Sequence, residues 1–284
     1  MSDWQLGDVT ITRVLEGETP VPAGFLFPDA SDEAVGVLDW LAPHFVDPKG
    51  RLLVAIQALV VRTPSKLIVV DTCLGNERQG RRIPRWNDLQ GPFLDDLQRA
   101  GIDRAAVDVV LCTHLHADHV GWNTMLVDGV WTPTFPNARY LISDAEFAHW
   151  SGQREDGEVA AVFADSLVPI MDAGLMDLVA TDHRICEEVR LAPTPGHTPG
   201  HVSVCIESKG ERALITGDFI HHPCQMAHPE WREIGDVDTV QSEATRRAML
   251  DTHADQPVLV IGTHFAGPAA GHVVRAGKAY RFEV

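Results

Sequence analysis

The sequence predicts an α+β fold in which the strands of a sheet carry polar side chains to one edge. Short apolar runs that are typical of buried strands alternate with segments of helical spacing. Several of these runs, such as Val107–Cys112 and Val258–Ile261, end at a Gly or a turn that is followed by a metal-competent residue. With 284 residues, 45% of them hydrophobic, the chain is long enough to bury a core as one domain over residues 1–284.

The first elements surround a long irregular segment. Val9–Val14 alternates between apolar and polar residues and predicts an edge strand. Residues 16–50 are interpreted as an excursion with short helical turns that covers the site or contacts a partner subunit. Two strands at Leu52–Val61 and Lys66–Val70 are expected to pair across the turn Thr63-Pro64-Ser65. Gly75–Pro92, with its arginines, is predicted to be a solvated surface loop.

The remaining elements alternate between helices and strands. Helical spacing predicts helices at Phe93–Ala100, Asp144–Trp150, Phe163–Ala173 and Thr239–Thr252. Apolar runs predict strands at Val107–Cys112, Val189–Leu191, Val202–Ile206, Ala213–Thr216, Val258–Ile261 and His272–Arg275. No composition break separates the two halves, so we expect an internal two-fold pseudo-repeat within one domain.

The run Thr113-His114-Leu115-His116-Ala117-Asp118-His119 is the strongest functional signal. Its His-X-His pair places two imidazoles on the same side of an extended segment, and the following Asp-His pair enters a turn. Imidazole and carboxylate ligands suit zinc, iron, cobalt or manganese.

Further metal-competent residues stand where other apolar runs end. His197 lies in the turn Pro195-Gly196-His197-Thr198-Pro199-Gly200-His201, Asp218 follows the run that ends at Gly217, and His264 follows the run that ends at Thr263. This layout is expected when strands deliver ligands to one edge of a sandwich.

Together these residues resemble the metallo-β-lactamase superfamily of hydrolases, from Val69-Val70-Asp71-Thr72 to His264. The resemblance implies a four-layer αββα sandwich with a dinuclear site at one sheet edge. Carried over by position, one metal ion is held by His114, His116 and His197, the other by Asp118, His119 and His264, and Asp218 bridges both. The implied cofactors are two divalent ions per chain, with zinc expected and iron, manganese or cobalt as alternatives.

The bridging carboxylate directs the choice of reaction. Family β-lactamases generally lack a residue like Asp218, whereas lactonases, glyoxalase II enzymes and organophosphate hydrolases carry one. Gly217-Asp218-Phe219-Ile220-His221 also resembles the corresponding segment of methyl parathion hydrolases. We therefore expect hydrolysis of a lactone of the acyl-homoserine type, or of an aryl ester, by a hydroxide that bridges the two ions.

Three residues are candidates for a catalytic role beyond metal binding. Asp118 is expected to accept the hydroxide proton after attack. Neither Tyr140 nor Tyr280 lies beside the segment that provides a tyrosine in acyl-homoserine lactonases, so His221 or His222 is the candidate donor.

Supporting and pocket residues complete the expected site. Asp71 is predicted to orient the ligand loop, and His201 is predicted to form hydrogen bonds within the turn after His197. The substrate pocket is expected to include the apolar side chains of Trp122, Phe265, Phe25, Phe27 and Met226.

Charge and composition limit the partners and the location. A formal net charge of -17 opposes a nucleic-acid surface and favours a neutral small substrate. The chain shows no apolar run long enough for a membrane span, no basic and apolar leader at Met1–Asp8, and scattered cysteines, which together predict a cytoplasmic protein. The resemblance implies a homodimer.

The same residues are compatible with alternative functions. Phosphotriesterase activity uses the same hydroxide, and a β-lactamase role is the next alternative. From another class, some members of this fold are mononuclear iron dioxygenases that act on persulfides, or diiron oxidoreductases.

Overall fold

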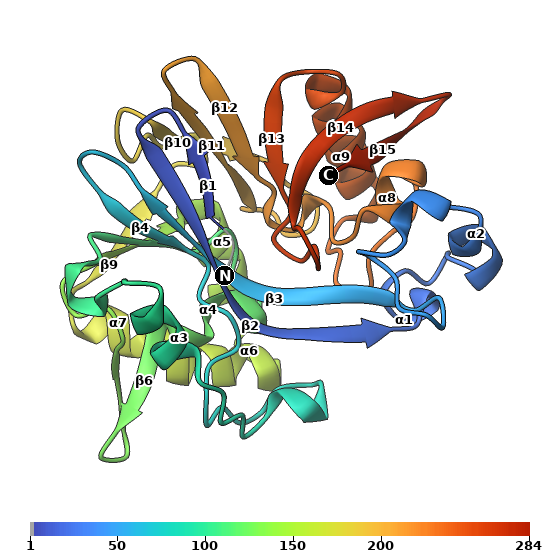
Figure 1. Cartoon of the computed structure of the whole chain (residues 1–284). Coiled ribbons are helices and arrows are strands. Elements are labelled where there is room, and N and C mark those ends of the chain that lie inside the picture. The colour runs from blue at the N-terminus through green and yellow to red at the C-terminus, as the bar shows by residue number, and fades with distance from the viewer. Residues whose placement is uncertain (1–2) are drawn as a thin grey trace.

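The computed structural model describes residues 3–284 and consists of two mixed β-sheets with helices on their outer faces (Figure 1). The first sheet has the order β1 (Asp3–Leu6), β2 (Val9–Val21), β3 (Leu52–Arg62), β4 (Leu67–Val70), β5 (Val109–Leu111), β8 (Arg139–Ser143) and β9 (Met176–Val179). The second has the order β10 (Val189–Pro193), β11 (Val202–Ser208), β12 (Glu211–Ile215), β13 (Val258–Ile261), β14 (Ala270–Ala276) and β15 (Ala279–Glu283). A separate hairpin joins β6 (Thr124–Val127) to β7 (Val130–Pro133).

The helices are mostly short. They are α1 (Ala23–Leu26), α2 (Asp32–Gly36), α3 (Phe93–Arg99), α4 (Ala117–Val120), α5 (Asp144–Ser151), α6 (Gly157–Val162), α7 (Val168–Asp172), α8 (Cys224–Ala227) and α9 (Thr239–His253). Ser143, Asp156 and Asp238 begin α5, α6 and α9 with side chains that accept backbone N–H groups of the first turn. In Figure 1, α3, α6 and α7 lie on one outer side and α8 and α9 on the opposite side.

Three buried apolar clusters separate four layers. One packs the first sheet against α3 and residues 162–170, a second fills the space between the sheets, and a third packs the second sheet against α8, α9 and residues 21–45. Strand alternation produces this division, since Ala58 and Val60 face the helices while Leu59 and Val61 face the other sheet. The αββα sandwich expected from the sequence is therefore confirmed.

Parallel pairing places several strand ends at one edge. β4, β5, β8 and β9 are parallel neighbours in the first sheet, and β12 and β13 are parallel neighbours in the second. The carboxyl ends of parallel neighbours meet at the same edge, so the segments after β5, β12 and β13 can converge. These are the segments that carry His114, Asp218 and His264.

Three sequence-based expectations need correction. Val9–Val14 is not an edge strand, because it begins the longer β2, which pairs with both β1 and β3. Residues 16–21 belong to this strand too, so the irregular segment begins only after Val21 and contains α1, α2 and the helical turn Asp39–Leu41. The strands β8 and β15 and the β6–β7 hairpin were not predicted.

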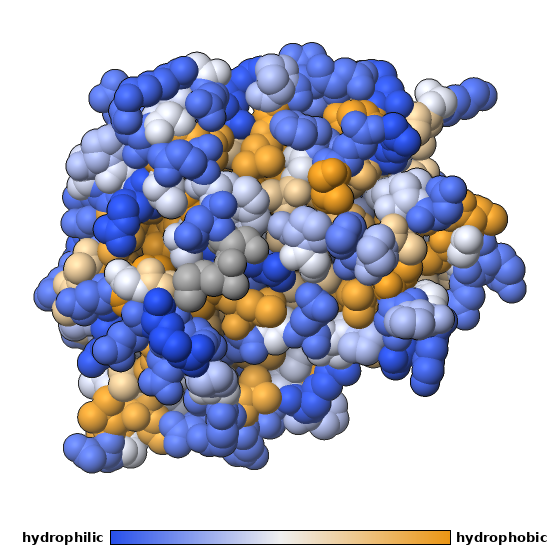
Figure 2. All heavy atoms as spheres, viewed as in Figure 1, coloured by the Kyte–Doolittle hydropathy of each residue, from blue (hydrophilic) through white to orange (hydrophobic). Residues whose placement is uncertain are grey.

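One face of the molecule carries apolar side chains among the polar ones (Figure 2). Figure 2 shows hydrophobic side chains at the lower left over the β6–β7 hairpin, where Val130 is 62% exposed. None of the described helices combines the length and the apolar character that crossing a bilayer requires.

Candidate metal centre

Segments from both sheets bring seven polar side chains together at one edge of the sandwich. His114 follows β5, His116 precedes α4, and Asp118 and His119 lie within α4. His197 lies in the turn between β10 and β11, Asp218 in the helical turn Gly217–Phe219 after β12, and His264 directly after β13. The structure thus brings together all seven residues expected to bind metal.

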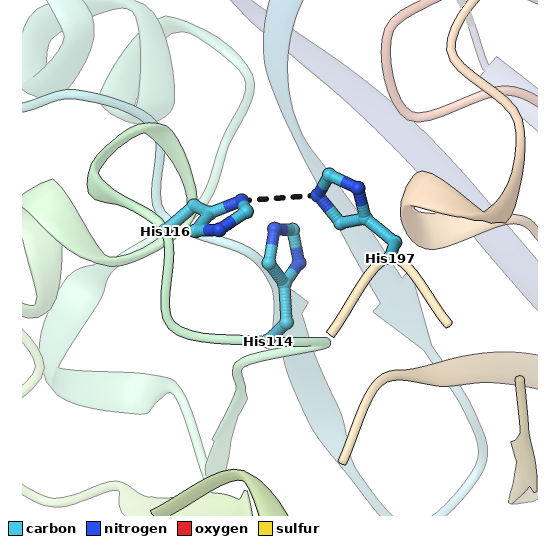
Figure 3. Close-up of side chains that lie close together, drawn as sticks. All are labelled: His114, His116 and His197. Atoms are coloured by element: carbon cyan, nitrogen blue, oxygen red, sulfur yellow. Dashed lines mark hydrogen bonds between the residues drawn. The ribbon is translucent and has the colours of Figure 1, made fainter. Parts of the chain in front are cut away.

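The first group consists of three imidazoles. His116 Nδ1 and His197 Nε2 lie 3.0 Å apart, and the ring of His114 lies between and below them (Figure 3). The three ligand nitrogens lie within 4.8 Å of one another.

The second group is Asp118, His119 and His264. His119 Nε2 and His264 Nε2 are 3.2 Å apart, and Asp118 Oδ2 lies 3.7 Å from His264 Nε2. Asp218 lies between the groups, because its Oδ2 is 3.2 Å from His119 Nε2 and 3.6 Å from His197 Nε2. Its position suits a shared ligand.

Acceptors outside the centre fix the orientation of three imidazoles. His119 Nδ1 lies 3.0 Å from Asp71 Oδ2, His197 Nδ1 lies 3.0 Å from Asp236 Oδ1, and His264 Nδ1 lies 2.8 Å from the carbonyl oxygen of Ala55. A Nδ1–H that donates to such an acceptor leaves the Nε2 lone pair directed at the centre, which is the tautomer a metal ligand requires.

His201 holds the backbone of Asp218 rather than directing a nitrogen at the centre. Its Nε2 accepts the backbone N–H of Asp218 at 2.6 Å, and its Nδ1 lies 3.0 Å from the carbonyl oxygen of Thr194. Burial, reinforced by the neighbouring His197, lowers the pKa of His201 to about 3, so its ring is neutral and can accept this bond.

The centre concentrates buried charge and unpaired polar atoms. Burial and neighbouring imidazoles hold the pKa of His114 well below its usual range. Burial alone would raise the pKa of Asp218, but the surrounding imidazoles hold it well below its usual range. Within residues 3–284, the buried atoms His114 Nε2 and Asp218 Oδ1 have no hydrogen-bond partner, a costly arrangement that a bound cation would relieve. The donor set therefore fits two divalent ions.

His221 also faces the centre, whereas His222 does not. His221 Nε2 lies 3.1 Å from Asp218 Oδ2, and the residue lines the adjacent cavity. The expectation for His222 is wrong: its Nε2 lies 2.8 Å from the carbonyl oxygen of Phe45 and its Nδ1 accepts the backbone N–H of Cys224. The two residues lie in a bend of the chain, and only His221 reaches the centre.

A cavity of about 450 Å³ opens above the candidate ligands. Its floor includes His116, Asp118, His197, Asp218, His221 and His264. Its walls are largely apolar and come from distant segments, including Leu26, Val54, Ile56, Trp86, Leu115 and Trp150.

Only one of the five predicted pocket residues, Phe25, lines this cavity. Trp122 instead stacks on Phe93 in the helix–sheet core, and Phe27, Met226 and Phe265 are fully buried in the opposite core. Trp122 and Phe265 lie close in sequence to His119 and His264, but this closeness did not indicate the direction of their side chains. Both rings point into the apolar cores.

The expectation of a solvated arginine cluster in residues 75–92 is also wrong in part. Arg78 and Arg81 are buried, and both pair with Asp165. Arg82 and Arg85 lie at the cavity.

Several acidic residues near the centre were not predicted from the sequence. Asp236 contacts His197, and Glu233 Oε2 lies 3.9 Å from His221 Nε2. Glu16 and Glu146 accept N–H groups from the loops beside the ligands. None of these four acidic residues belongs to a sequence motif, so their spacing in the chain did not indicate a place near the centre.

The family model of the metallo-beta-lactamase superfamily matches residues 52–265, a segment that contains the seven converging side chains. The chain belongs to the metallo-beta-lactamase superfamily. This finding confirms the resemblance inferred from the ligand motif.

Relatives and solved structures agree with this assignment. An N-acyl homoserine lactonase from Bacillus sp is 26% identical over 141 residues, which cover 49% of each chain, and one from Bacillus cereus is 24% identical over 60% of this chain and 66% of the relative. The match thus spans about half the length of the first of these curated relatives. The crystal structure of AbOPH, a hydrolase in the beta lactamase superfamily, has a TM-score of 0.81 and 26% identity, with coverage of 99% of this chain and 95% of the other.

A further solved structure shares the fold. AidC, a dizinc quorum-quenching lactonase in complex with a product, has a TM-score of 0.81 at 23% identity, with coverage of 99% of this chain and 96% of the other.

Proposed function

We propose that this protein is a dinuclear metal-dependent hydrolase that opens a lactone of the acyl-homoserine type or cleaves an aryl ester. The observation that carries this proposal is the convergence of seven ligand-type side chains, Asp218 among them, five of which line an apolar cavity. The lactonase names of the relatives from Bacillus sp and Bacillus cereus support the same substrate class.

The proposed ligands divide as the two groups described above. His114, His116 and His197 would hold one ion, Asp118, His119 and His264 the other, and Asp218 would contact both. Two divalent ions supply a water activated at neutral pH and a Lewis acid for the carbonyl oxygen. Zinc is the proposed metal, since it accepts this combination of imidazole and carboxylate ligands.

Two side chains are proposed to act on the substrate. His221 lines the cavity beside Asp218, so its ring can donate a hydrogen bond to the leaving oxygen or the carbonyl oxygen. A carboxylate oxygen of Asp118, which also faces the cavity, would take the proton released when water adds to the carbonyl carbon.

The cavity favours a neutral substrate with an apolar chain. Leu26, Val54 and Ile56 provide apolar wall, while Glu233 adds a carboxylate near the floor that opposes an anionic substrate. An uncharged lactone carrying an acyl chain fits both properties.

A substrate panel tests the proposal. The metal content of the purified protein should be two ions per chain, and N-acyl homoserine lactones or aryl esters should be hydrolysed faster than a paraoxon-type triester or a chromogenic cephalosporin. Turnover of the cephalosporin alone would overturn the substrate assignment. A protein that contains one iron per chain and oxygenates a persulfide would be a dioxygenase, and this result would overturn the hydrolase proposal.

We further propose a cytoplasmic homodimer that contacts its partner through residues 22–50. The exposed apolar side chains of Phe25 and Val37, at 47% and 76% exposure, and the five free cysteines support this proposal. Light scattering of the purified chain should give twice the monomer mass, and Val37→Asp should reduce it to the monomer value.

A further inference from the structure

Glu146 is a buried carboxylate in α5 that is not part of the seven-residue set. Its Oε1 accepts the backbone N–H of Leu115 at 3.0 Å and the indole N–H of Trp150 at 2.6 Å, and its Oε2 accepts the backbone N–H of Gly200 at 3.0 Å. Both oxygens are thus engaged by N–H donors.

These donors belong to the segments that carry the first three imidazoles. Leu115 lies between His114 and His116, and Gly200 closes the turn that carries His197. Ser143, which caps the same helix, reinforces the link because its hydroxyl donates to the carbonyl oxygen of Gly200 at 2.8 Å. One short helix therefore connects two ligand segments that are about eighty residues apart in sequence.

The contact between α5 and the His197 turn leaves no room for adjustment. A Cβ at Gly200 would lie 2.1 Å from the backbone nitrogen of Glu146, so only glycine permits this approach. The third donor, Trp150, packs edge-on against His116 with ring centroids 5.3 Å apart and lines the cavity.

We propose that Glu146 is a positioning residue that sets the separation of His116 from His197 and so determines the affinity of the three-histidine half of the centre. This inference rests on the proposed function, because it assumes that these imidazoles bind an ion. A carboxylate can accept from all three N–H donors, because both of its oxygens are acceptors. A glutamine at this position would turn its NH2 group, itself a donor, toward at least one of these N–H groups.

Glu16 provides a comparison within the same chain. It is partly buried in β2 and has the same kind of donors: the backbone N–H groups of Leu74 and Gly75 at 2.8 and 3.1 Å and the indole N–H of Trp122 at 2.6 Å. Trp122 follows the helix that carries Asp118 and His119, so Glu16 supports the other half of the centre.

The test compares Glu146→Gln, Glu16→Gln and Asp165→Asn in the full-length, metal-loaded protein. Zinc affinity is measured by competition with a chromophoric chelator, and the occupancy of each metal position by anomalous diffraction. We expect Glu146→Gln to weaken one ion by about 10- to 100-fold, with occupancy lost beside His114, His116 and His197. Glu16→Gln should reduce occupancy beside Asp118, His119 and His264.

Asp165→Asn controls for a loss of stability alone. This buried carboxylate pairs with Arg78 and Arg81 outside the centre, so its loss should lower the melting temperature and leave the three-histidine occupancy unchanged. Trp150→Phe, which keeps a ring against His116 and removes one donor, should show a smaller effect than Glu146→Gln.

The outcomes separate this inference from the proposed function. A wild-type protein that binds no zinc would overturn the proposed function. A wild type with two ions whose Glu146→Gln variant keeps both affinities, or loses both ions equally, would overturn the role of Glu146 alone.

Discussion

Asp236 shows how a single carboxylate prepares a candidate ligand. Its Oδ1 accepts from His197, its Oδ2 accepts the backbone N–H of Glu233, and the guanidinium of Arg246 lies 3.5 Å away. Burial would raise the pKa of Asp236, but the bond from His197 and the nearby His221 and Arg246 lower it to about 2. The carboxylate is therefore ionised at neutral pH and holds His197 in one orientation.

Replacing Asp236 should weaken metal binding without removing a ligand. In Asp236→Ala, His197 loses the acceptor on its outer nitrogen, and we expect zinc affinity to fall by about 10- to 100-fold. Asp236→Asn keeps an acceptor oxygen and should show a smaller loss. Chelator competition measures both, and an unchanged affinity in the alanine variant would contradict the role of this contact.

His221 is expected to affect catalysis more than metal content. His221→Ala removes the proposed donor and should lower kcat for lactone hydrolysis by about 100-fold or more, the range of general acid–base contributions. Metal analysis should still give two ions, because all seven proposed ligands remain. A variant that retains wild-type kcat, or that loses an ion, would contradict the proposed role.

His222 gives a pH-dependent contribution to stability. Burial lowers its pKa to about 4, below the value of about 6.5 for an unfolded histidine. Between these values the unfolded chain binds the extra proton, so the free energy of unfolding rises with pH across this window and falls as the solution is acidified.

Comparing wild type with His222→Gln isolates this contribution. The unfolding free energy is measured with urea between pH 4 and 6.5. Its slope against pH should be smaller in the variant by up to about 1.4 kcal/mol per pH unit, which corresponds to one proton. An unchanged slope would show that His222 does not titrate as the buried contacts with Phe45 and Cys224 imply.

At the scale of elements, the strand ends were predictable and the cavity walls were not. β4, β5, β12 and β13 are short apolar runs whose ends carry Asp or His residues, so both the strands and the ligand positions are visible in the sequence. The walls come from α1, residues 82–86 and α5, which approach the ligands only in the folded chain. Their positions depend on packing that no local pattern encodes.

Residues 75–92 illustrate the same limit. Polar composition predicted a solvated loop, but the Arg78 guanidinium donates to the carbonyl oxygens of Gly121, Thr124 and Asp165 and lies 3.8 Å from the ring centroid of Trp131. Burial lowers the pKa of Arg78 to about 10, so it remains charged at neutral pH. One buried cation thus fixes the loop against the β6–β7 hairpin and the segment after His119.

Arg78→Ala should therefore be strongly destabilising. The change leaves the buried carbonyl groups without their donor and the Asp165 carboxylate with Arg81 as its remaining arginine partner, and we expect the free energy of unfolding to fall by about 3–5 kcal/mol. Arg82→Ala is the control, since Arg82 is 65% exposed where it pairs with Asp156 and should contribute at most about 1 kcal/mol. Similar losses in the two variants, measured by chemical denaturation, would contradict the structural role of Arg78.

For the whole molecule, the candidate centre connects the two halves of the sandwich. His114, His116, Asp118 and His119 follow β5 of the first sheet, whereas Asp218 and His264 follow β12 and β13 of the second. Ions bound only by the folded chain would therefore stabilise it as a unit, by about 3 kcal/mol for each ion present at 100 times its Kd.

Metal removal should consequently lower the melting temperature of the entire chain in one transition. Two ions at such concentrations give about 5–6 kcal/mol, and a domain of this size shifts by about 2–4 °C per kcal/mol, so chelation should lower Tm by about 10 °C or more. Added zinc should restore it. In Asp218→Asn, where the shared carboxylate is lost, the shift on chelation should be much smaller because the ions bind weakly before the chelator is added. A wild-type Tm that does not respond to chelation would mean that the two sheets are held together by their apolar cluster alone, and that the converging side chains contribute no metal-dependent stability.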